Sequence, residues 1–96
     1  MNFIDLLKTK REEILNMAAR YGAHNVRIFG SVARGEADSS SDIDFLVTFT
    51  PGTSLFQHAT LQLELEKLLG CKVDIASERG LRDRIRDRVF QEAVPL

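Results

Sequence analysis

Two aspartates at the head of an apolar strand constrain this chain more than any other feature of its sequence. The segment from Asp42 to Phe49 alternates in the manner of a half-buried strand, and its apolar face consists of Ile43, Phe45, Val47 and Phe49. Asp42 and Asp44 share the other face, about 6 to 7 Å apart, where two bare carboxylates raise the pKa of one of them. The pair therefore predicts a hard divalent cation such as Mg²⁺, which binds one or two carboxylates together with substrate phosphates.

A sharp turn at Gly30 and Ser31 supplies the second half of the expected site. The apolar strand Val26–Phe29 ends there, and a residue without a Cβ suits a tight turn that approaches a ligand closely. Ser31 then begins a short helical turn that runs to Arg34, and free N–H groups at such a turn attract an anion. We therefore expect phosphate at Gly30 and Ser31 and a metal ion at the aspartates, which together describe a metal-bound nucleoside triphosphate.

Single residues exclude two better-known motifs in the same region. The glycine spacing of a Walker A loop is present, but Glu36 stands where its phosphate-binding lysine is required. The acidic loop that begins at Asp38 has Ile43 in place of the glycine of a calcium-binding EF-hand loop, and Phe49 in place of its final glutamate.

A third strand is expected over Lys72–Ala76, with Asp74 between two β-branched apolar residues. An aspartate is unfavourable in the middle of a strand, and such a local violation often marks a functional site. A structural carboxylate paired with an arginine is the alternative. Helical spacing of apolar residues predicts helices over residues 3–21, over 55–69 and from residue 81 to the helix-ending Pro95. The resulting order of elements describes an α/β domain with a small sheet covered by helices.

Length and composition allow one domain, residues 1–96, and disfavour several partners. The formal net charge of -1 argues against binding to bulk nucleic acid or to an anionic membrane. The sequence contains no apolar run long enough to cross a bilayer, and its amphipathic N-terminus is unlike a signal peptide. The single cysteine, Cys71, cannot form an internal disulfide, so we expect a cytoplasmic protein.

Three short segments carry a family resemblance: Gly30-Ser31, Ala33-Arg34-Gly35-Glu36 and Asp42-Ile43-Asp44. Together they resemble the nucleotidyltransferases of the DNA polymerase β type. The chain looks most like their minimal branch, the small MNT proteins that are paired with HEPN toxins. Asp74 in Lys72-Val73-Asp74-Ile75 and the ending Glu92-Ala93-Val94-Pro95-Leu96 also resemble that branch.

The resemblance implies the polymerase β-like nucleotidyltransferase fold, in which a small mixed β-sheet with flanking helices brings Asp42, Asp44 and Asp74 together on adjacent strands. It implies transfer of AMP from ATP, or of another nucleotide from its triphosphate, to a hydroxyl group. Asp42 and Asp44 are then expected to hold two Mg²⁺ ions, for which Mn²⁺ can substitute, and Asp74 to complete the shell of the second ion.

Gly30, Ser31 and Arg34 are the expected ligands of the terminal phosphates, although an ion pair with Glu36 is an equal alternative for Arg34. The implied partner is a HEPN-type ribonuclease toxin in a hetero-oligomer, with a tyrosine hydroxyl as the acceptor and neutralisation of the toxin as the result. Two other functions stay open at this point. The chain could be a non-catalytic antitoxin that inhibits its toxin by covering it, or the catalytic subunit of a small-molecule nucleotidyltransferase.

Overall fold

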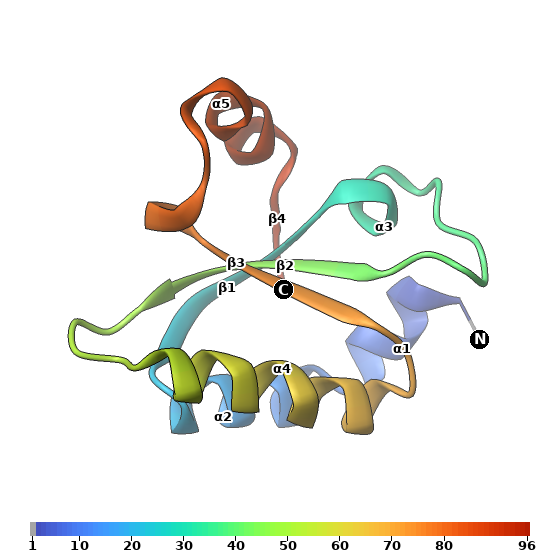
Figure 1. Cartoon of the computed structure of the whole chain (residues 1–96). Coiled ribbons are helices and arrows are strands. Elements are labelled where there is room, and N and C mark those ends of the chain that lie inside the picture. The colour runs from blue at the N-terminus through green and yellow to red at the C-terminus, as the bar shows by residue number, and fades with distance from the viewer. Residues whose placement is uncertain (1) are drawn as a thin grey trace.

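A four-stranded mixed sheet forms the centre of the protein in a computed structural model that describes residues 2–96 (Figure 1). The strand order is β3-β2-β1-β4, where the strands are β1 (Ala23–Phe29), β2 (Ile43–Phe49), β3 (Val73–Ser77) and β4 (Val94–Pro95). β1 is antiparallel to both of its neighbours, β2 and β4, whereas β2 and β3 are parallel. The expected small mixed sheet with flanking helices is therefore confirmed.

Helices cover the two faces of the sheet unequally. α2 (Arg11–Arg20) and α4 (Leu55–Leu69) lie against one face, and α5 (Asp83–Glu92) lies on the opposite side (Figure 1). The main core lies on the α2 and α4 side and includes the fully buried Ile14, Ile43, Phe45 and Leu61. The short α3 (Gly30–Arg34) follows β1 directly, and the 3-10 helix η1 (Glu78–Gly80) follows β3. Within residues 2–96, no helix combines the length and the apolar character that a membrane span requires.

The helix expected over residues 3–21 is wrong in its continuity, because α1 (Phe3–Thr9) and α2 are separated at Lys10. The hydroxyl of Thr9 donates a 2.8 Å hydrogen bond to the carbonyl oxygen of Asp5, four residues earlier. This back-bonding by threonine bends helices, which explains the break without a proline or a glycine.

The helix over Leu55–Leu69 is confirmed at both ends. The Ser54 hydroxyl accepts a hydrogen bond from the Gln57 N–H, and the Gln57 side chain accepts one from the Ser54 N–H, which together form a capping box. Gly70 ends the helix in the left-handed conformation, with φ of 69°. β2 and β3 match the expected strands to within one residue at each end.

The helix expected from residue 81 to Pro95 is shorter in the structure, because α5 spans only Asp83–Glu92 and Val94 and Pro95 form β4. Ile28 of β1 pairs with Val94, and the Leu96 N–H donates to the Val26 carbonyl oxygen at 3.1 Å. β1 itself begins at Ala23 rather than at Val26. Its register shifts between His24 and Arg27, and the positive φ of 52° at Asn25 interrupts the alternation that reveals a strand in sequence.

Candidate active site

Asp44 and Asp74 are direct neighbours across the parallel pair of β2 and β3, where their Cα atoms are in register. Both face away from the main core, because Ile43 and Phe45, which flank Asp44, are fully buried within it. Asp42 lies one residue before β2. The structure thus places Asp44 and Asp74 side by side on one face of the sheet, and Asp42 lies close enough for its negative charge to act on Asp44. Asp44 and Asp42 are half-buried, whereas Asp74 is exposed.

Gly30 packs directly against Asp44. The last residue of β1, Phe29, pairs with Asp44, and the chain turns immediately afterwards at Gly30 with φ of +74°. A Cβ atom at Gly30 would overlap Oδ2 of Asp44 and lie 3.1 Å from its Cγ. The predicted sharp turn at Gly30 is therefore confirmed by its left-handed backbone, and the close carboxylate of Asp44 is a second reason for glycine at this position. The close approach of a ligand to Gly30 stays a prediction.

The carboxylate of Asp44 is the electrostatically perturbed group of this region. Its pKa is raised to about 6 by burial first, and then by the negative charges of Asp74, Asp42 and Glu92, while Arg34 opposes the shift. A bound divalent cation relieves such repulsion and lowers the pKa of the carboxylates around it.

The donor set fits Mg²⁺, which prefers carboxylate oxygens. Within residues 2–96, however, no three side chains of His, Cys, Asp or Glu converge into a ready-made metal centre. Mg²⁺ usually keeps several waters and takes further ligands from substrate phosphates, so it does not need an all-protein cage. Asp42, Asp44 and Asp74 therefore fit as a partial shell that a triphosphate completes.

Asp74 lacks the arginine partner that its structural alternative requires. None of the ion pairs formed within residues 2–96 includes Asp74. In the arginine-rich α5, Arg86 is held elsewhere. Its Nη1 donates to the Glu78 carbonyl oxygen at 3.2 Å, and its guanidinium lies over the Phe90 ring.

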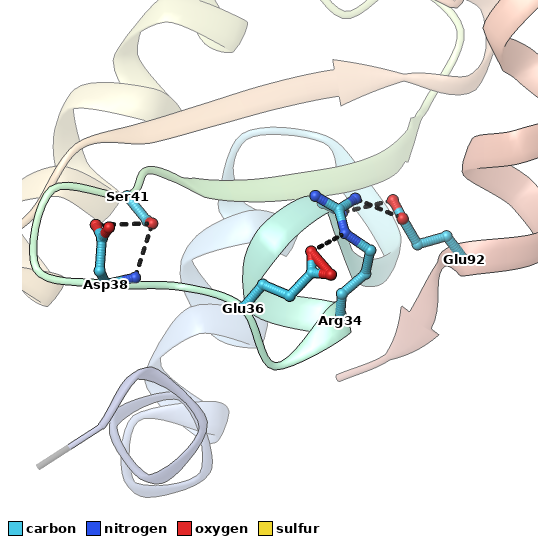
Figure 2. A network of polar contacts seen from close by, with 6 residues as sticks. Arg34, Glu36, Asp38, Ser41 and Glu92 are labelled. Atoms are coloured by element: carbon cyan, nitrogen blue, oxygen red, sulfur yellow. Dashed lines mark hydrogen bonds and ion pairs between the residues drawn. The ribbon is translucent and has the colours of Figure 1, made fainter.

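Arg34 is held by two carboxylates at once (Figure 2). Its Nε donates to Glu36 Oε2 at 2.7 Å, which is the ion pair considered as the alternative role of this arginine. Its Nη1 also donates to Glu92 Oε1 at 2.6 Å, which the sequence did not predict. The hydrogen bonds to Glu36 and Glu92 raise the pKa of Arg34 above its ordinary value, so it stays charged at any physiological pH.

Glu92 is the member of this region that sequence reasoning missed. Its Oε2 accepts a 2.8 Å hydrogen bond from the Gly30 N–H while its Oε1 holds Arg34. Burial acts to raise the pKa of Glu92, but the hydrogen bonds from Arg34 and from Gly30 outweigh it and lower that pKa. The sequence did draw attention to the ending that begins at Glu92, because this ending resembles that of the MNT proteins. The resemblance indicates no role for Glu92 itself.

Ser31 and the loop from α3 to β2 complete the surroundings. Ser31 is half-buried in the first turn of α3, and within residues 2–96 its hydroxyl has no hydrogen-bond partner. In the loop, Asp38 Oδ1 accepts from the Ser40 N–H at 2.9 Å. Ser41 Oγ accepts from the Asp38 N–H at 2.9 Å (Figure 2). Asp38 is thus occupied in fixing the loop that leads into Asp42, and its hydrogen bonds from Ser40 lower its pKa.

Comparisons with known proteins show what this chain is similar to. The family described as "Nucleotidyltransferase domain" matches residues 10–96. A relative from Thermococcus cleftensis, named protein adenylyltransferase MntA, is 40% identical over 75 residues, which cover 78% of this chain and 76% of that protein.

Two solved structures have the same fold. One, described as a "putative minimal nucleotidyltransferase", is 55% identical to this chain and superposes with a TM-score of 0.87. The superposition includes 96% of this chain and 94% of that one. Another, described as a toxin-antitoxin with AMP-PNP, superposes with a TM-score of 0.75 at 20% identity, over 88% of this chain and 69% of that one. At that identity the second likeness shows the fold alone.

Proposed function

The chain belongs to the nucleotidyltransferase domain family, and from this membership we propose that it transfers AMP from ATP to a tyrosine hydroxyl of a HEPN-type toxin and thereby acts as its antitoxin. The observation that carries the proposal is the placement of Asp44 beside Asp74, with Gly30 packed against Asp44. The name of the Thermococcus relative, a protein adenylyltransferase, supports a protein as the acceptor.

Phosphoryl chemistry requires a protein mainly to position its reactants and to neutralise charge. Asp42, Asp44 and Asp74 would hold Mg²⁺, and a pair of such ions would supply charge stabilisation for the attacking and leaving oxygens. The acceptor oxygen forms a bond to the α-phosphorus while the bond to pyrophosphate breaks. We assign the departing hydroxyl proton to a carboxylate oxygen of Asp74, because that side chain is the exposed one and lies where an acceptor can approach.

The phosphates of ATP would bind at the other end of the site. The Ser31 hydroxyl has no partner within residues 2–96 and can donate to a phosphate oxygen. Arg34 uses only Nε and one Nη1 hydrogen in its two ion pairs, so further N–H groups of its guanidinium are available for the β- and γ-phosphates. These contacts would hold the pyrophosphate as it leaves.

Intact mass spectrometry of the toxin tests this function. The purified HEPN partner is incubated with this protein, Mg²⁺ and each of the four ribonucleoside triphosphates in turn. We expect a mass increase of whole AMP units with ATP, and none with the Asp42→Asn/Asp44→Asn variant. The matched control is Asp83→Asn/Asp87→Asn, which removes the same charge from exposed positions of α5 and should leave the modification intact.

The outcomes also separate the alternatives. No mass increase with a toxin that demonstrably binds this protein would contradict the transferase function and favour a covering antitoxin. Modification of a small molecule instead of the toxin would favour the catalytic subunit of a small-molecule nucleotidyltransferase.

A further inference from the structure

The carboxylate of Glu92 joins the end of α5 to Gly30 and Arg34, two of the three residues expected at the terminal phosphates. It accepts from the Gly30 N–H through Oε2 and from Arg34 through Oε1, at 2.8 and 2.6 Å. On the basis of the proposed function, we infer that Glu92 is a positioning residue for the triphosphate, which it does not itself contact. Its role is to hold Arg34 and the Gly30 turn in the geometry that binds the β- and γ-phosphates.

The contacts of Arg34 show how such positioning works. The side chain is exposed enough to be mobile alone, with 36% of its surface accessible. Glu36 and Glu92 bind Nε and Nη1, and therefore fix the plane of the guanidinium while leaving its other N–H groups free. A side chain that is already ordered loses less entropy when a ligand binds, so the two carboxylates favour phosphate binding.

The backbone of Glu92 is itself anchored. The residues that follow it form β4, which pairs with β1 just before Gly30. The Glu92 side chain is only 15% exposed, so its carboxylate has little freedom to turn away. The two-residue strand β4 thus has a function beyond its small contribution to the sheet, because it holds Glu92 over the turn at Gly30.

The opposite role for Glu92 predicts an opposite result. A carboxylate that imitates a phosphate would compete with ATP, and its neutralisation would strengthen nucleotide binding. Positioning is favoured here because Glu92 is anchored through both its backbone and its side chain, while Arg34 keeps free donors. The sign of the change in affinity therefore decides between the two roles.

The experiment measures binding of a non-hydrolysable ATP analogue and of AMP, each with Mg²⁺, by isothermal titration calorimetry. In Glu92→Gln, the amide oxygen can still accept from the Gly30 N–H, but the charge that holds Arg34 is lost. We expect the ATP analogue to bind about tenfold more weakly, as for the loss of one charged hydrogen bond, and AMP to bind as before because it lacks the β- and γ-phosphates. The control is Asp87→Asn, an equal change of charge at an exposed position of the same helix, which should change neither affinity.

A double-mutant cycle tests whether Glu92 acts through Arg34. Arg34→Ala alone should weaken binding of the ATP analogue, and adding Glu92→Gln should weaken it no further. Thermal unfolding confirms that each variant folds. If Glu92→Gln does not fold, Glu92→Asp, which keeps the charge but is too short to bridge both partners, should show the same selective loss.

Several results would overturn the inference. These are unchanged or tighter binding of the ATP analogue by Glu92→Gln, equal losses for the analogue and AMP, or additive losses in the double variant. If the wild-type protein binds no triphosphate at all, the proposed function fails as well. If the wild type binds it and Glu92→Gln binds it equally, only the positioning role fails.

Discussion

Replacement of Gly30 by alanine should be among the most damaging single substitutions in this chain. An L-residue at φ of +74° is strained by about 1 to 2 kcal/mol. The added Cβ would also overlap Oδ2 of Asp44, and turning that side chain away from its rotamer costs about 0.5 to 1.5 kcal/mol. Together the two effects predict a loss of about 1.5 to 3.5 kcal/mol, or about 6 to 28 °C in Tm for a domain of this size.

Gly35 provides a matched control for the backbone strain. It has the same φ of +74°, but a Cβ there would meet no atom of residues 2–96 within 4 Å. Gly35→Ala should therefore cost only the strain of about 1 to 2 kcal/mol. Thermal or urea unfolding of the two variants, both without metal, gives the loss of stability for each. The difference between the two losses measures the overlap with Asp44.

A double variant of Gly30 and Asp44 tests the overlap in a second way. Asp44→Ala should raise the stability of Gly30→Ala by more than it raises that of the wild type, because the carboxylate that the new Cβ meets is gone. Equal destabilisation by Gly30→Ala and Gly35→Ala, or no relief by Asp44→Ala, would refute the reasoning that Gly30 is required by the approach of Asp44.

Three further predictions concern charge and phosphate at the site. Because the pKa of Asp44 is raised to about 6 in the folded protein from 3.8, the metal-free protein should lose stability as the pH rises from 4 through 6. Asp44→Asn should therefore be more stable than the wild type at pH 8 but not at pH 4. If the two proteins have equal Tm values at each pH, the repulsion assigned to Asp44 is contradicted. An ATP analogue with Mg²⁺ should raise the Tm of the wild type, and chelation of the Mg²⁺ by EDTA should abolish that increase. The Tm of Asp42→Asn/Asp44→Asn should not change in either condition. Ser31→Ala should weaken binding of the ATP analogue by about fivefold to tenfold, as for one lost hydrogen bond, with unchanged Tm; calorimetry that shows wild-type affinity would remove Ser31 from the phosphate site.

The sequence predicted the site best where one burial pattern or one backbone requirement dominates. Ile43 and Phe45 are fully buried, so the alternation that placed Asp44 on the other face was reliable. Gly30 was identifiable because its conformation and its contact with Asp44 both exclude a side chain. Leu46 lies on the same face as the aspartates and is also fully buried. The alternation of the strand does not explain this burial, but η1 and α5 lie on that side of the sheet and do.

Glu92 could not be assigned from the sequence because its role depends on a long-range fold of the tail. β4 has only two residues, too few for any periodicity, and its pairing with β1 is what brings Glu92 to Gly30. The break at Lys10 escaped prediction for a local reason, since apolar spacing continues through it and only the back-bonding hydroxyl of Thr9 marks it.

The most direct test of the proposed function asks whether the toxin stays inactive after this protein has been removed. The proposed HEPN toxin partner is incubated with this protein, ATP and Mg²⁺, then separated from it under conditions in which untreated toxin keeps its ribonuclease activity. We predict that toxin treated with wild-type protein stays inactive, whereas toxin treated with Asp42→Asn/Asp44→Asn regains full activity on separation. Recovery of full activity in both samples would contradict covalent modification and show that inhibition requires the bound protein.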